Sequence, residues 1–192
     1  MNEYVSIFLK SMLVDNVVFI QYLAICPFIG MTSDTGKAVG MGFATTFVII
    51  LATAATYPIY YGLLVPNNLQ FLQTLLFILV IASLVQLVEF YLKKSVPSLY
   101  SAFGVYLALI TTNCAVLGIT LNCISKQYNY LEAIVYSIGS ALGFVIAMAV
   151  MAGVRERMKS ATLPAAIKDK GILFIAAGLL SLAFLGFSGL IK

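Results

Sequence analysis

The sequence predicts an all-α integral membrane protein with six transmembrane helices. Hydrophobic residues make up 62% of the 192 residues and charged residues only 9%, whereas a soluble domain carries about 25% charged residues. The mean hydropathy is +1.05, and too few polar side chains remain to cover a water-exposed surface. The apolar residues gather in stretches of about 20 or more, the length that crosses the hydrocarbon core of a bilayer.

The six predicted spans are separated by short polar connectors, namely "MTSDTGK", "VPNN", "KKSVPS", "SKQYNY" and the longer, charged "RERMKSATLPAAIKDK". The N-terminal "MNEYVSIFLK" has neither the basic region nor the cleavage site of a signal peptide, so we expect the first span to be retained. The spans are Tyr4–Ile25, Ala38–Leu64, Leu69–Leu92, Leu99–Ile124, Leu131–Val154 and Gly171–Ile191.

Two of these spans are irregular, and we expect their helices to be interrupted. The first carries polar side chains, and Pro27 follows it directly after Cys26, which disturbs a helical backbone. The fourth carries "TTNC" at its centre, where threonine and asparagine offer the backbone alternative hydrogen bonds. The third, fifth and sixth spans read as uninterrupted apolar helices.

Basic residues predict the orientation of the chain, because lysine and arginine concentrate in cytoplasmic loops. The connectors after the first, third and fifth spans hold eight of them, whereas the other side holds only Lys126 and Lys192. We therefore expect those three connectors in the cytoplasm and both termini outside it. The net charge of +4 reflects this asymmetry, and no nucleic acid partner is expected. The eight residues are Lys37, Lys93, Lys94, Arg155, Arg157, Lys159, Lys168 and Lys170.

A short repeat relates the two halves of the chain. "CPFIGM" from Cys26 aligns with "CAVLGI" from Cys114, and "AVGMGFATTFVII" resembles "SIGSALGFVIAMA" further along. Residues 1–95 and 96–192 then each contribute three spans to one membrane domain, 1–192. Because three is odd, the second half must enter the membrane from the opposite side, an inverted repeat whose site usually lies on interrupted helices. Gly30 and Gly118, four residues after each cysteine, would permit close approach of backbone.

The paired cysteines predict a shared metal site. A single cysteine in an apolar helix is usually a small buried side chain, and we expect this of Cys123, which has no counterpart in the first half. Cys26 and Cys114, at equivalent positions of inverted halves, should instead meet near the pseudo-twofold axis. Thiolates suit a soft metal, and an iron–sulfur cluster takes four of them. This chain would supply two, and a second chain of similar build would supply the others. A disulfide is the alternative, less expected for a cytosol-facing membrane site.

The motifs "CPFIG", "GMGFATTFV", "TTNCAVLG", "RERM" and "GLLSLAFLGFSGL" together resemble the A subunit of Rnf complexes along nearly the whole chain. These complexes are bacterial redox-driven ion pumps that move electrons between ferredoxin and NAD. The resemblance therefore implies a translocase subunit in the bacterial cytoplasmic membrane, without independent activity or a catalytic residue of its own. It also implies a [2Fe-2S] cluster shared with the homologous, oppositely oriented E subunit, with Cys26 and Cys114 at the matching ligand positions. The B, C, D and G subunits of the Rnf complex would be further partners.

Other cofactors and other functions are weighed against this resemblance. "LATAAT" from Leu51 lacks the glycine of the flavin-attachment motif, and no Gly-rich dinucleotide fingerprint is present, so we expect neither flavin nor NAD on this chain. The similar E subunit of Na⁺-translocating NADH:quinone reductase is the nearest alternative. A secondary transporter with an inverted repeat and no cluster is an alternative of another class. Asp15, inside the first span, is either functional or held by solvent and Asn16.

Overall fold

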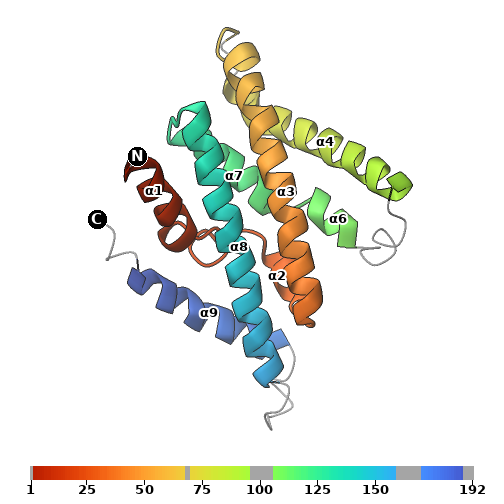
Figure 1. The fold of residues 1–192 in the computed structure, drawn as a ribbon, viewed down its shortest axis with the longest axis vertical. Helices are drawn as coiled ribbons and strands as arrows, with labels where there is room; N and C mark the ends of the chain where they lie inside the picture. Colours follow the sequence, from red (N-terminus) through yellow and green to blue (C-terminus); the bar gives the residue numbers. More distant parts are fainter. Residues whose placement is uncertain (1, 68–69, 96–105, 159–169, 188–192) are drawn as a thin grey trace.

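The computed structural model describes residues 2–67, 70–95, 106–158 and 170–187, and within these ranges every regular element is a helix and no strand occurs. Figure 1 shows the helices gathered around two long central ones, α3 and α8. The predicted all-helical class is therefore confirmed.

The two central helices, α3 (Thr35–Ile59) and α8 (Tyr130–Met158), run antiparallel. At one end the Thr35 hydroxyl donates to Glu156 Oε2 over 3.3 Å. At the other end the Tyr57 hydroxyl donates to the Tyr128 carbonyl over 2.9 Å. Contacts at both ends show that the helices lie side by side along their length. A π-helical turn, η2 (Tyr60–Leu64), extends α3 just after Pro58.

The N-terminal helix α1 (Asn2–Leu9) continues as a π-helical turn, η1 (Lys10–Val14), and packs on α8. Two glycines of α8, Gly139 and Gly143, face it. A Cβ added at Gly139 would collide with Ser11 Oγ and the Phe8 carbonyl, and one at Gly143 would lie 2.7 Å from the Met12 carbonyl oxygen. Small residues four apart are a common means of bringing membrane helices into close contact.

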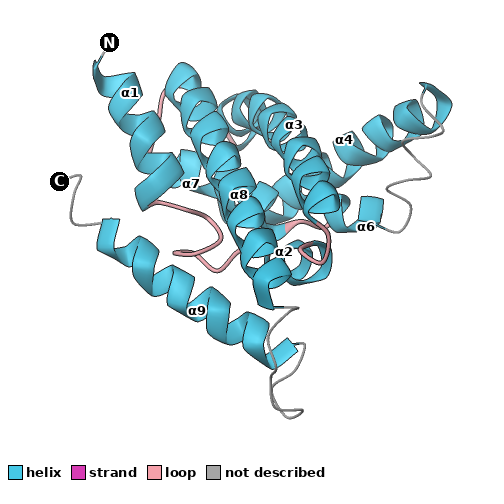
Figure 2. Cartoon of the chain, turned by 60° about the horizontal axis from the view of Figure 1, so that its bottom comes forward, coloured by secondary structure: helices cyan, strands magenta, loops and turns pink. Residues whose placement is uncertain are grey.

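The remaining helices flank the central pair on two sides (Figures 1 and 2). On the α3 side lie α4 (Gln73–Ser95, preceded by a 3₁₀ turn, Gln70–Leu72), α6 (Tyr106–Thr111) and α7 (Cys114–Ser125). On the α8 side, α9 (Lys170–Phe187) contacts α8 and η1. The short helix α2 (Ile25–Met31) lies between the break that follows η1 and the start of α3.

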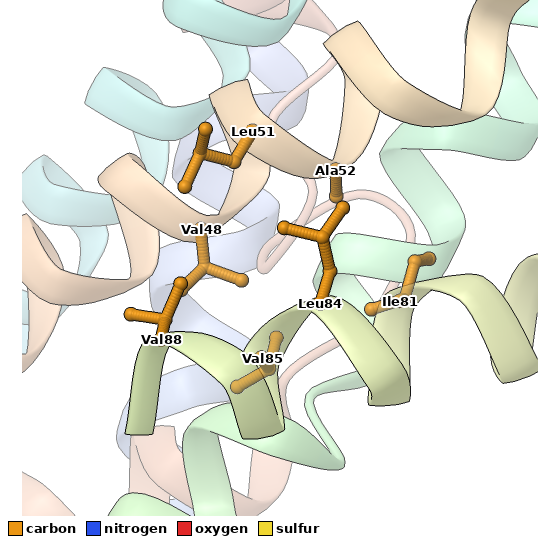
Figure 3. Close-up of a pocket in the computed structure, with 7 residues that line it drawn as sticks. All are labelled: Val48, Leu51, Ala52, Ile81, Leu84, Val85 and Val88. Carbon is orange, nitrogen blue, oxygen red and sulfur yellow. The ribbon is translucent and has the colours of Figure 1, made fainter. Parts of the chain in front are cut away.

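Aliphatic side chains of α3 and α4 face each other where the two helices meet. Figure 3 shows these side chains around a small cavity between the two helices. Without a polar group, the cavity offers no hydrogen-bonding partner to a ligand, so it is packing space rather than a site. The lining residues are Val48, Leu51, Ala52, Ile81, Leu84, Val85 and Val88.

Three helical segments in the described ranges have the length and apolar composition needed to cross a membrane: Thr35–Leu64, Gln70–Tyr91 and Tyr130–Met158. They correspond to the second, third and fifth predicted spans. Leu109–Ser125 and Gly171–Gly186 form shorter apolar helices. The predicted start of the fourth span, Leu99, and the predicted end of the sixth span, Ile191, lie outside the described residues.

Two predicted boundaries are wrong. Helix α8 continues to Met158, so "RERM" belongs to the helix and not to the following connector. Cationic side chains in the last turn of a helix interact favourably with the helix dipole, so α8 continues beyond its apolar stretch. Helix α3 begins at Thr35, before the expected Ala38, because Asp34 caps it by accepting the Gly36 N–H over 3.2 Å.

Candidate metal centre at two helix breaks

Cys114 is the first residue of α7, and Asn113 caps that helix. The Asn113 backbone is extended (φ −72°, ψ 115°), and its Oδ1 accepts the Ala115 N–H over 3.1 Å. This is the usual geometry of an asparagine N-cap, which ends one helix and starts another. The sequence "TTNC" therefore separates α6 from α7 and places the Cys114 side chain at a helix N-terminus, where negative charge is favoured.

Cys26 is the second residue of α2, and the backbone before it is left-handed. Ala24 has φ 62° and ψ 31°, and Tyr22 has φ 54°. Non-glycine residues adopt this conformation only when their surroundings enforce it. Pro27 occupies the first turn of α2, where its missing N–H forfeits no helical bond.

The two cysteine motifs meet at one hydrogen bond. The Ala24 N–H donates to Cys114 Sγ over 2.9 Å, although 90 residues separate the two in the chain. Cys26 and Cys114 are both free and exposed. The fold therefore places Cys114 Sγ against the backbone of Ala24, two residues before Cys26.

Cys123 lies apart from this arrangement. Its side chain is buried, and its thiol donates to the Ala133 carbonyl, 3.7 Å from the sulfur. This agrees with the expectation that Cys123 is a buried apolar side chain.

The break segment, Asp15–Ala24, separates η1 from α2, and Asn16 holds it in place. Asn16 is fully buried. Its Nδ2 donates to the Gly143 carbonyl over 3.0 Å, and its Oδ1 accepts the N–H groups of Val18 (3.0 Å) and Phe19 (3.4 Å). The Asn16 side chain thus satisfies two backbone N–H groups that the interrupted helix leaves free, as lipid surroundings require, and it ties the break segment to α8 through the Gly143 carbonyl.

Helix α9 supplies further contacts to the break segment. The Ser181 hydroxyl donates to the Phe19 carbonyl over 2.6 Å and lies 3.0 Å from the Tyr22 hydroxyl. The Phe19 ring stacks on Phe184 with centroids 4.6 Å apart. These contacts fix the backbone on either side of the left-handed Tyr22.

Helix α7 holds the same segment from the other side. Asn122 Nδ2 donates to Gln21 Oε1 over 2.9 Å. Leu23 fills the space beside Gly118, where an added Cβ would collide with its side chain. Gly118 therefore leaves room for the Leu23 side chain, whereas the expected neighbour was backbone. At Gly30, nothing lies within 4 Å of where a Cβ would be, so the expected close approach there is wrong within the described residues.

Charged side chains bracket the site. Asp15 forms an ion pair with Lys126, which follows the last residue of α7, so it is not held by solvent and Asn16 alone. Burial lowers the pKa of Lys126, but the hydrogen bond to Asp15 and the neighbouring charges outweigh it, and that pKa lies above its ordinary value. The Lys126 ammonium also lies 4.7 Å from the centre of the Tyr136 ring, a cation–π distance.

Arg155 lies at the other end of α2. Its Nη1 donates to the Ile29 carbonyl over 3.0 Å and to Thr32 Oγ1 over 3.3 Å. A guanidinium there satisfies a carbonyl of the last turn and complements the helix dipole. The charged cluster around Arg155 indicated only a membrane anchor in the sequence, and no local pattern predicted this contact.

Comparison with known proteins identifies the family. The family described as "Rnf-Nqr subunit, membrane protein" matches residues 4–191. The chain belongs to the Rnf-Nqr subunit family of membrane proteins. The predicted resemblance is thereby confirmed.

Its relatives within the Rnf-Nqr family are named as A subunits of ion-translocating oxidoreductases. The chain is 50% identical over 186 residues, 97% of each chain, to the A subunit of the "Na(+)-translocating ferredoxin:NAD(+) oxidoreductase complex" of Acetobacterium woodii. It is 49% identical over 190 residues (99% of this chain, 98% of the relative) to the A subunit of the "Ion-translocating oxidoreductase complex" of Azoarcus sp. strain BH72. The protein of the same name from Aeromonas salmonicida is 45% identical over 192 residues, the full length of both.

The residues present fit one half of the cluster site that the resemblance of the sequence implies. Two exposed thiols lie at adjoining helix starts. In the described part of the chain, no three Cys, His, Asp or Glu side chains gather as a metal site. Asn113 directly precedes Cys114 in the sequence. Its Nδ2 is buried and has no hydrogen-bond partner among the described residues. A four-thiolate site built here would need two ligands from another chain.

Proposed function

We propose that this chain is a membrane subunit of a translocase that couples electron transfer between ferredoxin and NAD to the transport of Na⁺ or H⁺. We propose further that Cys26 and Cys114 provide half the ligands of a [2Fe-2S] cluster inside the membrane. The other half would come from the homologous, oppositely oriented E subunit. Family membership and the names of the relatives support the first statement.

The observation that carries the cluster proposal is the hydrogen bond from the Ala24 N–H to Cys114 Sγ, 2.9 Å long. It joins the two cysteine motifs at one point, as two ligands of one site require. Both thiols are free and exposed, so they remain accessible to a partner chain. Cys123 is also free, but it is buried, so it is not accessible to a partner chain.

The chain's own residues would stabilise negative charge at this point. The Ala24 N–H donates to the Cys114 sulfur, and a hydrogen bond to an ionised acceptor is stronger than one to a neutral acceptor. Cys114 also opens α7, whose N-terminal dipole favours an anionic group. When bound, the cluster would supply one-electron transfer. The hydrogen bonds of Asn16 and Ser181 hold in place the break segment that precedes Cys26.

The packing supports the inverted repeat and its interrupted first and fourth helices. Helices α3 and α8, the equivalent second helices of the two halves, run antiparallel. Helix α1, before the break of the first half, packs on α8, and its equivalent before the break of the second half, α6, contacts α3. A pseudo-twofold axis between α3 and α8 would relate these two helix contacts to each other. The helical structure ends at Val14 and at Thr111, and resumes at Ile25 and Cys114.

The remaining proposals concern partners and location. We place the chain in the bacterial cytoplasmic membrane with both termini outside the cytoplasm, as the distribution of basic residues indicates. The B, C, D and G subunits of the complex are the proposed partners besides the E subunit. Neither flavin nor NAD is assigned to this chain.

The test replaces each cysteine by serine in the intact complex. Cys26→Ser and Cys114→Ser should each abolish one iron–sulfur electron paramagnetic resonance (EPR) signal and electron transfer, because an iron would lose a ligand. Cys123→Ser is the matched control, since its sulfur is buried away from the breaks, and it should retain both. Full iron content and activity in either of the first two variants would refute the proposal and favour a transporter without a cluster.

A further inference from the structure

One face of α7 contacts the backbone turn that precedes Cys26. Side chains four residues apart lie on the same face of a helix, and Cys114, Gly118 and Asn122 follow this spacing along α7. At the start of this face, Cys114 Sγ accepts the Ala24 N–H over 2.9 Å. The face that carries the sulfur therefore also carries two further residues that meet the turn.

The next two positions of this face contact residues just before Ala24. The Leu23 side chain occupies the space beside Gly118, where an added Cβ would collide with Leu23 Cδ1 and lie 3.6 Å from Leu23 Cγ. Asn122 Nδ2 donates to Gln21 Oε1 over 2.9 Å. The turn thus lies along α7, and the glycine supplies the space that the leucine side chain fills.

The turn depends on such contacts because its backbone is strained. Tyr22 (φ 54°) and Ala24 (φ 62°, ψ 31°) are both left-handed, a conformation that non-glycine residues keep only when their surroundings enforce it. The Tyr22 hydroxyl lies 3.0 Å from Ser181 Oγ on α9, so this side of the turn is held. Leu23 lies between the two left-handed residues, and its side chain also packs against the hydrophobic core. A displacement of Leu23 is therefore passed to Ala24, whose N–H meets the sulfur.

We propose that Leu23 is a positioning residue: its side chain, seated beside Gly118, keeps the backbone N–H of the next residue on the Cys114 sulfur. This hydrogen bond raises the reduction potential of the iron–sulfur group bound at Cys114. The inference rests on the proposed function. Hydrogen bonds to the sulfurs of an iron–sulfur centre help set its potential, because a donor stabilises the negative charge that reduction adds.

The test measures the midpoint potential of one EPR signal in the intact complex, namely the signal that the Cys114→Ser complex lacks. Gly118→Ala adds a methyl group where Leu23 Cδ1 now lies, which pushes Leu23 away from α7 and lengthens the bond to the sulfur. Gly118→Ala combined with Leu23→Ala carries the same methyl group on α7 without the collision. Cys123→Ser is the matched control, because it alters α7 where the thiol donates to the Ala133 carbonyl of α8.

We expect Gly118→Ala to retain the signal while its reduction equilibrium constant falls about tenfold, which is about 59 mV for a one-electron couple. The double variant should recover most of this fall, because the shortened side chain at position 23 lets the turn return to α7. Two independent losses of packing would instead add. Cys123→Ser should leave the potential unchanged.

An unchanged potential in the loaded Gly118→Ala complex, or a fall that the double variant does not recover, would overturn this inference alone. If Gly118→Ala loses the signal, the double variant decides: a signal restored by Leu23→Ala supports the inference, and a signal still absent overturns it. If the wild-type complex has no signal that depends on Cys114, the proposed function fails, and this inference fails with it.

Discussion

Replacing Gly143 by alanine tests the contact that holds the break segment. A Cβ at this position would lie 2.7 Å from the Met12 carbonyl oxygen and 3.3 Å from Asn16 Nδ2. Unstrained contacts between heavy atoms lie at about 3.5 Å, so η1 would have to retreat by about 0.8 Å. The bond from Asn16 Nδ2 to the Gly143 carbonyl, now 3.0 Å, would then lengthen beyond hydrogen-bonding range.

The expected loss of stability follows from three contributions. Overpacking of a tight contact costs about 1–3 kcal/mol, and a lost hydrogen bond within a membrane protein costs about 0.6–1.7 kcal/mol. The better helix propensity of alanine returns about 0.5–1 kcal/mol. The net destabilisation is about 2 kcal/mol, which corresponds to a fall in Tm of about 4–8 °C.

Gly153→Ala is the matched control, because Gly153 lies on the same helix and nothing is within 4 Å of its would-be Cβ. This variant should be as stable as the wild type or slightly more so. The assay is the thermal unfolding of the purified complex in detergent, with retention of the Cys114-dependent EPR signal as a second readout. Equal Tm values for the two alanine variants would refute the argument that α8 and η1 are in close contact at Gly143.

Two further predictions concern the break segment and the topology. Asn16→Ala leaves the backbone N–H groups of Val18 and Phe19 without their acceptor, at about 1–3 kcal/mol for each buried group, and also removes the bond to the Gly143 carbonyl. The complex should therefore unfold at a lower temperature than an Asn122→Ala control, and equal stability would contradict this role of Asn16. A reporter that is active only in the cytoplasm should stay silent when fused after Lys192 and be active when inserted after Thr162. A strong signal after Lys192 would reverse the topology.

Local sequence located the second helix break better than the first. "TTN" before Cys114 affects backbone hydrogen bonding within a few residues, so its influence does not depend on the rest of the fold. Pro27 instead lies in the first turn of α2, and the first break, Asp15–Ala24, precedes it. The structure places left-handed residues and a new helix start at the first position and an N-cap at the second. Helix ends were less predictable, because hydropathy marks the apolar stretch and α8 continues through "RERM".

The partners of the break segment could not be predicted. In the sequence Asn16 is only a polar residue in an apolar stretch, yet its Nδ2 bonds the carbonyl of Gly143, 127 residues away. The sequence leaves Asp15 between two interpretations, and neither of them involves Lys126. A signal for the α1–α8 contact existed in the spacing of Gly139 and Gly143, since small residues four apart often mark helix contacts in membranes.

Composition and local spacing by themselves determined the membrane class, the apolar stretches, the cap at "TTNC" and the repeated cysteine motif, because each depends on residues that are neighbours in the chain and on lipid as the solvent. Tertiary structure alone decided that Ala24 donates to Cys114, that Asn16 reaches Gly143 and that Arg155 caps α2. Those bonds join residues about 90 to 130 positions apart. They depend on how the helices pack, and the spacing of residues along one helix does not specify which neighbour its polar groups will meet.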